Sequence, residues 1–321
     1  MSAAQERQRQ PLCPDVRRGT LIAFTIGVAA VAAGVIRAGA GAVAQALDGL
    51  HLGGLLVLAL LHLPIVVLMG FAWRLASGDD PPASLSRFLW ARFVRDAAGE
   101  ALPFVNFGGI VFGVRALGRG RAIILGAISA CIDGVIELTA KLPYVLAALL
   151  TLLALGPQTH FKRLLSLALA ATGIVVGGLL VARRSLGAWL AVMMRAVSSR
   201  WPAVLPRDDA DAGRDVQACF NRILRQRTRL WSAFALHLCC WCLGAGEAWV
   251  VFRLLGVDLT LSQALAIDGT VVGLRTFGFM VPAAAGVQEV SYMLAAAVFG
   301  IPPAAAIAAR SEERRVGKEC Q

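Results

Sequence analysis

The sequence predicts an all-α polytopic membrane protein with about six to eight transmembrane helices, and three observations predict this fold class. Hydrophobic residues make up 58% of the 321 residues, whereas a soluble domain is only about 45 to 50% apolar. Several uninterrupted apolar stretches reach the roughly 20 residues that a helix needs to cross a bilayer. Arginines gather in short polar segments beside these stretches, which is typical of loops that set membrane orientation.

The net charge of +11 would suggest nucleic-acid binding in a soluble protein. Here the arginine excess lies beside apolar runs, in the N-terminal segment and in residues 73–95, 115–121 and 183–229, and not in residues 37–54. This distribution predicts a multi-pass protein of the cell inner membrane with a cytoplasmic N-terminus. It also argues against a nucleic-acid partner.

Four apolar segments predict spanning helices: Thr20–Ile36, Leu52–Trp73, Leu164–Ala182 and Ser232–Phe252. The first has no small-residue cleavage motif, so we interpret it as a signal anchor rather than a removed signal peptide. A fifth segment, Ala122–Leu155, would be about 50 Å long as one helix. Two possibilities stay open for it: one tilted helix that is kinked at a proline, or two shorter pieces.

Two further apolar segments, residues 88–117 and 264–303, are interrupted by charged residues, proline and glycine. Irregular backbone at membrane depth is tolerated only where it is buried in protein or lines a polar cavity. Both segments are therefore predicted to be re-entrant hairpins. If residues 122–155 cross once, the two hairpins enter from opposite faces, an inverted arrangement that transporters use to build a site near the midplane. The interruptions include Pro103, Gly108, Gly109, Pro282 and Gly286.

Residues 1–310 are interpreted as a single membrane domain, because no polar linker or low-complexity tract divides them. Within it, residues 183–229 form a basic cytoplasmic connection with apolar residues at roughly helical spacing. Two interpretations of this connection stay open: an amphipathic helix on an anionic leaflet, or an ordinary solvated loop. Residues 311–321 differ abruptly in composition and are interpreted as a non-native tail, so we expect a final helix to be missing.

Charged residues within the apolar segments are candidate functional groups, because each is unfavourable by a few kcal/mol at membrane depth. Asp133, Glu137 and Lys141 are spaced four apart and therefore share one helical face. The spacing predicts an ion-pair ladder in which Lys141 partly neutralises the two carboxylates. Such a ladder either takes part in function or only joins helices.

A second charged face precedes the first interruption. Arg92, Arg95, Asp96 and Glu100 place two guanidinium groups beside two carboxylates on one side of a helix. Planar guanidinium suits a phosphate or carboxylate head group, and the following turn, residues 103–109, would let backbone amides approach that group. The alternative is a band of snorkelling side chains at the membrane interface.

Glu247 is a further candidate, because Gly244, Gly246 and Trp249 around it would let a neighbouring helix approach closely. His237 lies ten residues away, about 15 Å along a helix, so the two side chains are not expected to pair with each other. We interpret His237 as a satisfied histidine at a helix interface.

No metal, cofactor or catalytic residue is predicted. The group Cys239, Cys240 and Cys242 lacks a second ligand pair at zinc spacing, and we interpret it as small residues in helix packing. The sequence has no nucleophile elbow, P-loop, dinucleotide fingerprint or zinc-protease helix. We therefore expect that the protein is not an enzyme.

Two motifs resemble a known family. Residues 88–116, FLWARFVRDAAGEALPFVNFGGIVFGVRA, and residues 279–289, FMVPAAAGVQE, are similar to paired signatures of the flippase-like family related to the membrane region of lysylphosphatidylglycerol synthases. The closest similarity is to its hopanoid-associated branch. The matching positions are Arg92, Arg95, Asp96, Glu100, Pro103, Gly108, Gly109, Arg115, Pro282, Gly286, Gln288 and Glu289.

The resemblance implies a role in moving or handling inner-membrane lipids, either hopanoids or phospholipids, with proteins of hopanoid synthesis or export as partners. It stops at the membrane part of the synthases, so aminoacyl transfer is not implied. The chain departs from the family at Ala284 and Ala285, where many relatives have glycine.

Three functions are consistent with these features. The first is a lipid transporter or flippase in which the interrupted segments form a polar site near the midplane. The second is a non-catalytic scaffold of a lipid-synthesis complex. The third, favoured by no particular residue, is a membrane-embedded enzyme that modifies a lipid.

Overall fold

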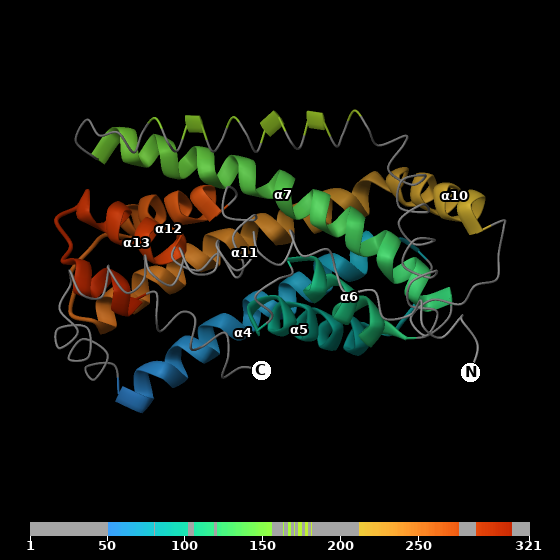
Figure 1. Cartoon of the computed structure of the whole chain (residues 1–321), viewed down its shortest axis with the longest axis horizontal. Coiled ribbons are helices and arrows are strands. Elements are labelled where there is room, and N and C mark those ends of the chain that lie inside the picture. The colour runs from blue at the N-terminus through green and yellow to red at the C-terminus, as the bar shows by residue number, and fades with distance from the viewer. Residues whose placement is uncertain are drawn as a thin grey trace, which may run out of the picture.

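The computed structural model describes residues 51–79, 81–101, 106–118, 121–155, 212–275 and 287–309, together with scattered positions between 163 and 181. Within these ranges every regular element is a helix (Figure 1). The expected span Thr20–Ile36, most of Leu164–Ala182 and the tail at residues 311–321 lie outside the described residues.

Three of the described helices are long and apolar enough to cross a membrane: α4 (His51–Ala76), α7 (Arg121–Leu155) and α11 (Arg227–Leu254). Large apolar side chains on α4 face outward, among them Leu56, Leu60 and Leu63, which are 61%, 60% and 50% exposed. Lipid is the solvent that tolerates such a surface, because exposed apolar patches of this extent are rare on soluble proteins. The predicted fold class, an all-α membrane protein, is confirmed.

Residues 121–155 form one continuous helix that contains Pro143, so the alternative of two shorter pieces is wrong. At 1.5 Å per residue this helix is about 50 Å long. In Figure 1 it runs along most of the long axis of the molecule, with α11 beside it. The two helices therefore connect both ends of the described structure.

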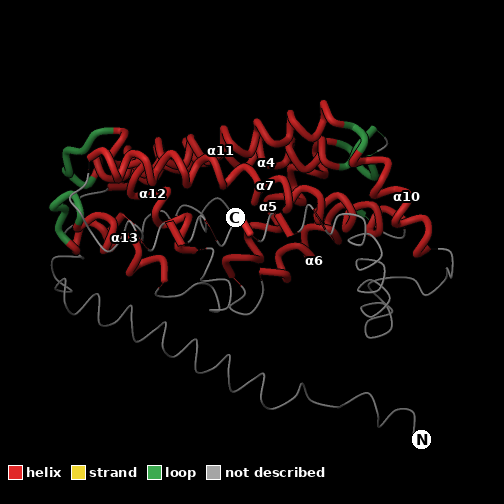
Figure 2. The backbone as a smooth tube through the Cα atoms, turned by 90° about the horizontal axis from the view of Figure 1, so that it is seen from above, coloured by secondary structure: helices red, strands yellow, loops and turns green. Residues whose placement is uncertain are grey.

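Shorter helices pack at each end of this pair. At one end α5 (Leu85–Ala101) and α6 (Asn106–Leu117) bury Phe88 and Leu117 against Trp73 of α4. At the other end α12 (Leu261–Arg275) and α13 (Val287–Ala297) share a core with the last turns of α11. Seen from above in Figure 2, α5, α6 and α13 lie on the same side of α11.

Each of the two segments predicted to be interrupted contains two short helices. Helices α5 and α6 have 17 and 12 residues, and α12 and α13 have 15 and 11. All four are therefore about 16 to 26 Å long, shorter than the roughly 30 Å of hydrocarbon. Pro103, Pro282 and Gly286 lie between these helices, outside the described residues. Re-entry from opposite faces of the membrane stays a prediction.

Part of the basic connection packs against protein. Helix α10 (Ala212–Leu224) buries Val216, Phe220 and Ile223 against Ile132 of α7 and the end of α4. Its apolar face is therefore covered by helices, which neither interpretation of residues 183–229 anticipated. Residues 182–211 lie outside the described part of the chain.

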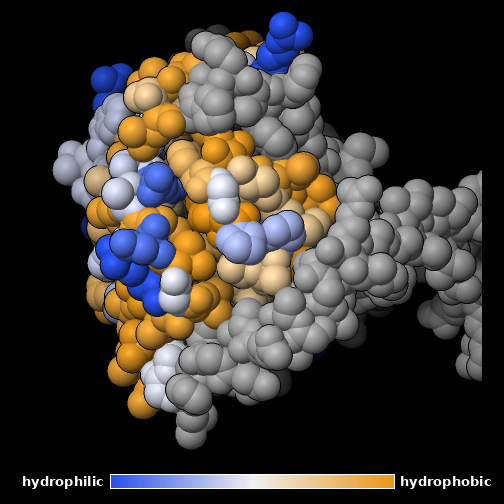
Figure 3. Space-filling model, turned by 90° about the vertical axis from the view of Figure 1, so that its left-hand side faces the viewer, coloured by the Kyte–Doolittle hydropathy of each residue, from blue (hydrophilic) through white to orange (hydrophobic). Residues whose placement is uncertain are grey.

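The end of the molecule formed by α12 and α13 is coated largely with hydrophobic residues, interrupted by small hydrophilic patches (Figure 3). Arg253 of α11 pairs with Asp258, with 2.9 Å between Nη1 and Oδ1. A hydrophobic surface of this kind agrees with contact to lipid acyl chains.

Helices α7 and α12 meet at Gly269, where a Cβ atom would overlap Ala148. Gly269→Ala is expected to separate the two helices and to lower the free energy of unfolding by about 1 to 3 kcal/mol. Unfolding of the purified protein in mixed micelles with increasing dodecyl sulfate measures the change. Gly246→Ala is the matched control, since a Cβ there has open space. Equal stability of the two variants would contradict the predicted overlap.

Candidate functional site

A buried network of charged side chains joins three helices near their middle. We call it the ion-pair cluster. Its members come from α5, α7 and α11, and they are Arg92, Arg95, Asp96, Asp133, Glu137 and His237. Five of these six were candidates in the sequence, which placed Arg92, Arg95 and Asp96 on one helical face and Asp133 and Glu137 on another, but did not predict that the two faces meet.

Arg92 lies at the centre of the ion-pair cluster and is only 4% exposed. Its Nε donates to Asp96 Oδ2 over 2.9 Å, within α5. Its Nη1 lies 3.3 Å from Glu137 Oε2 and 3.5 Å from Asp133 Oδ2 of α7. One guanidinium group therefore contacts three carboxylates, which offsets the cost of burying its charge.

Arg95 bridges the same two helices one turn further on. Its Nη1 donates to Asp133 Oδ2 over 2.9 Å, and its Nη2 lies 3.5 Å from Glu137 Oε2. The guanidinium group stacks over the buried ring of Trp73, 5.7 Å from its centroid. Trp73 is fixed in turn, because its Nε1 donates to Ser129 Oγ over 3.0 Å. These contacts hold Arg95 in one orientation.

His237 completes the ion-pair cluster from α11. Both His237 and Asp133 are fully buried, and His237 Nε2 lies 2.9 Å from Asp133 Oδ1. Asp133 therefore accepts from Arg95 on one oxygen and faces the imidazole with the other. His237 lies at a helix interface, as interpreted, but it is satisfied only in part, because its Nδ1 has no hydrogen-bond partner in the part of the chain that the structure describes.

Two glycines set the position of the arginines. A Cβ at Gly109 of α6 would overlap the carbonyl oxygen of Arg95, and one at Gly113 would lie 2.8 Å from Arg95 Cβ and 2.9 Å from the carbonyl oxygen of Ala91. Helices α5 and α6 can touch along this line only because side chains are absent. Gly109 was expected in a turn that lets backbone amides approach a head group; the structure instead places it in a helix, against its neighbour.

The other predicted site residues lie outside the ion-pair cluster or outside the described side chains. Glu247 forms a separate buried pair with His62 of α4, with 3.1 Å between Oε2 and Nδ1. Arg115 is exposed in the last turn of α6. The structure does not describe the side chains of Glu100, Gly108, Gln288 and Glu289.

The prediction that His237 and Glu247 do not pair with each other is confirmed, since each has another partner. Sequence reasoning missed His62, and it also missed the hydrogen bond between the Tyr144 hydroxyl of α7 and Asp268 of α12. The available signal was the same in each case: a polar side chain within an otherwise apolar helix.

Lys141 also contacts α11. Its Nζ lies 5.1 Å from the centroid of the Trp241 ring, one turn beyond Glu137. From α5, Arg92 and Arg95 pair with the carboxylates of α7. The predicted ladder on α7 is thus completed by a neighbouring helix.

The acidic residues of the ion-pair cluster resemble a metal site in their spacing. Asp133, Glu137 and His237 present ligand-type atoms within 4.8 Å of one another. However, the carboxylates of Asp133 and Glu137 already accept from two guanidinium groups, whose fixed positive charge repels a cation. We therefore assign no metal to these residues.

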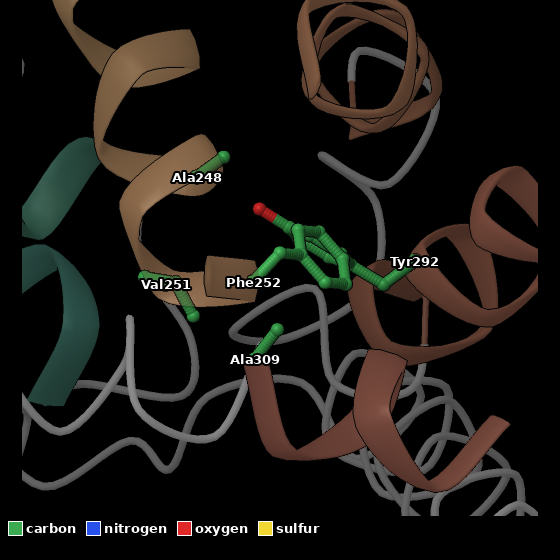
Figure 4. Close-up of a pocket in the computed structure, with 5 residues that line it drawn as sticks. All are labelled: Ala248, Val251, Phe252, Tyr292 and Ala309. Carbon is green, nitrogen blue, oxygen red and sulfur yellow. The ribbon is translucent and has the colours of Figure 1, made fainter. Parts of the chain in front are cut away.

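A small apolar pocket lies at the opposite end of the molecule, between α11 and the helices that follow it (Figure 4). Its lining is hydrophobic apart from the hydroxyl of Tyr292. Such a lining offers no charge to a head group. The lining residues are Ala248, Val251, Phe252, Tyr292 and Ala309.

Comparison with known proteins gives one match. None of the curated proteins and none of the solved structures compared with the chain matches it. Residues 20–310, which include every described helix, match the family model described as the lysylphosphatidylglycerol synthase TM region. The match covers most of the chain and includes both interrupted segments. The chain therefore belongs to the lysylphosphatidylglycerol synthase TM region family, and it is a lipid-related membrane protein.

Proposed function

We propose that this protein binds the polar head group of a lipid at the ion-pair cluster and moves the lipid between the leaflets of the inner membrane. One observation carries the proposal: two guanidinium groups, Arg92 and Arg95, are buried among membrane helices. Charges at this depth are unfavourable and are found where a substrate or ion passes.

The geometry of the cluster suits exchange of partners. In the structure, Asp133 and Glu137 form salt bridges with the two guanidinium groups, with nitrogen–oxygen distances of 2.9 to 3.5 Å. A phosphate group presents oxygens with the same geometry as a carboxylate and can replace one of them in a bidentate contact. The protein's own carboxylates thus keep the site neutral until a head group arrives.

The short helices beside the cluster support movement rather than static binding. Arg92 and Arg95 lie on α5, which is too short to span the bilayer and ends at an interruption. Broken helices of this kind form the moving parts of many transporters. In this proposal, α12 and α13 form the inverted counterpart of α5 and α6.

The lipid is proposed to be a hopanoid or a phospholipid. The hopanoid link is supported by the similarity of residues 88–116 and 279–289 to the hopanoid-associated branch of the family. The phospholipid alternative is supported by the two arginines, since planar guanidinium pairs best with phosphate. No chemical conversion is needed in either case, so we propose transport without catalysis.

The proposal is tested by reconstituting the full-length protein in liposomes with fluorescent phosphatidylglycerol or a fluorescent hopanoid in the inner leaflet. Arg95→Gln removes a cation but leaves Arg92 in place, and it is expected to slow lipid movement at least about tenfold, the effect of losing one charge-assisted contact. Dithionite bleaching of outer-leaflet fluorescence measures the rate.

Arg253→Gln is the control, because Arg253 is half exposed and pairs with a carboxylate far from the cluster. It is expected to leave the rate unchanged. If the wild-type protein moves neither lipid, or if Arg95→Gln moves it as fast as the wild type, transport at this site is wrong. Restored lipid distribution in cells by an inactive Arg95→Gln variant would favour the scaffold function instead.

A further inference from the structure

We propose that His237 is a proton-binding site linked to the anion site, so that its imidazole takes up one proton when a lipid phosphate binds to Arg92 and Arg95. The inference rests on the proposed function and deepens it, because it names the ion that binds together with the lipid. It is carried by the position of His237 within the ion-pair cluster and by the balance of charge around it.

The geometry gives each nitrogen of His237 a different role. Asp133 Oδ2 accepts from Arg95 over 2.9 Å, so the carboxylate of Asp133 acts as an acceptor here. The imidazole therefore donates from Nε2 to Asp133 Oδ1, 2.9 Å away. In that neutral form Nδ1 carries a lone pair and no proton. It has no hydrogen-bond partner among the described residues, so it is the atom that can accept a proton.

Among the described side chains in and beside the ion-pair cluster, positive and negative charges balance while the imidazole of His237 is neutral. Helix α5 contributes two cations and one carboxylate, and α7 contributes two carboxylates and one cation. From α4, the uncharged side chains of Met69 and Trp73 contact the guanidinium groups, and His62 pairs with Glu247 of α11 outside the cluster; on α11 itself the thiol of Cys240 donates to the carbonyl oxygen of Ile65. The charged groups are Arg92, Arg95, Asp96, Asp133, Glu137 and Lys141.

A phosphodiester head group adds one negative charge to this balanced set. Net charge buried among membrane helices is strongly unfavourable. A proton that passes from water to His237 Nδ1 adds one positive charge and restores the balance. Lipid and proton therefore bind together, and the affinity for the lipid increases as the pH falls.

The direction of the pH dependence follows from the linkage between proton binding and lipid binding. If the complex holds one more proton than the free protein, the dissociation constant falls by up to about tenfold for each unit decrease in pH, within the range where histidine titrates, about pH 5 to 8. A gradient of protons across the membrane would then drive the accumulation of the lipid in one leaflet.

The experiment uses the full-length protein in phosphatidylcholine nanodiscs and dioctanoyl phosphatidylglycerol as the probe, because its phosphodiester does not titrate in this range. Tryptophan fluorescence, to which Trp73 beside Arg95 contributes, gives the dissociation constant at each pH. Titration calorimetry in buffers of different ionisation enthalpy counts the protons taken up. We expect about one proton per lipid and the pH dependence given above.

Two matched variants assign the proton. His237→Gln retains a donor towards Asp133 but does not titrate, so its dissociation constant is expected to be independent of pH, with no proton uptake. His62→Gln changes the other histidine–carboxylate pair, with 3.1 Å between its atoms, and is expected to keep the pH dependence of the wild type.

The outcomes separate the two claims. If the wild type binds phosphatidylglycerol with the same affinity at every pH and without proton uptake, the proton site is wrong while the anion site stands. Undetectable binding in the wild type overturns the anion site and the proton site together. Unchanged pH dependence in His237→Gln, or its loss in His62→Gln, overturns the assignment to His237.

Discussion

Replacing Arg92 by glutamine is expected to lower the free energy of unfolding by about 3 to 5 kcal/mol, the range found when one partner of a buried ion pair is removed. The side chain is 4% exposed and contacts three carboxylates. Without it, Asp133 and Glu137 share a single remaining guanidinium group at membrane depth. Unfolding with dodecyl sulfate, followed by circular dichroism, measures the loss.

A second substitution tests whether unbalanced charge is the cause. The double variant Arg92→Gln, Glu137→Gln removes one charge of each sign, so it is expected to recover most of the lost stability. Arg253→Gln is the exposed control: its pair with Asp258 has the same distance of 2.9 Å but lies at the surface, where such pairs contribute about 1 kcal/mol or less. A loss in Arg253→Gln as large as that in Arg92→Gln would contradict the role of burial.

Gly109→Ala is expected to disrupt the α5–α6 hairpin and to slow lipid movement. The new methyl group would overlap the carbonyl oxygen of Arg95, which belongs to the backbone and cannot rotate away. Overpacking of this kind lowers stability by about 1 to 3 kcal/mol, and a displacement of α5 by about 1 Å is enough to reduce the rate of a positioned reaction about a hundredfold. Thermal unfolding and the liposome assay measure the two effects.

Gly99→Ala provides a control within the same hairpin. A Cβ at Gly99 has no atom within 4 Å, so this variant is expected to fold and to move lipid as the wild type does. It also replaces glycine inside a helix, which by itself stabilises by up to about 1 kcal/mol. If the two alanine variants behave alike, close contact between α5 and α6 does not position Arg95.

The faces of the charged helices could be predicted from spacing, but their partners could not. Asp133 and Glu137 are four residues apart, and Arg92 and Asp96 are too, so each pair lies on one side of its helix. Periodicity does not state which helix lies opposite. The contacts from Arg92 and Arg95 to α7 join residues about 40 positions apart, and they depend on how α5 packs.

The same limit explains the pairs that were missed. His62 lies in a leucine-rich span whose sequence predicts only a lipid-embedded helix, and its partner Glu247 is 185 positions away. Gly109 was recognised as part of an interruption, because glycine and proline mark breaks in helices. Its contact with the Arg95 backbone was not predictable, since a glycine has no side chain whose chemistry indicates a neighbour.

Photo-crosslinking tests most directly whether the ion-pair cluster receives a lipid head group. The probe is phosphatidylglycerol with a diazirine on its head group, added to the full-length protein in nanodiscs and mapped by mass spectrometry. We predict adducts in residues 85–101 and 121–155 that unlabelled phosphatidylglycerol competes away and that Arg95→Gln abolishes. Adducts confined to outward-facing side chains such as Leu60 and Leu150, without competition, would contradict a head-group site at the cluster.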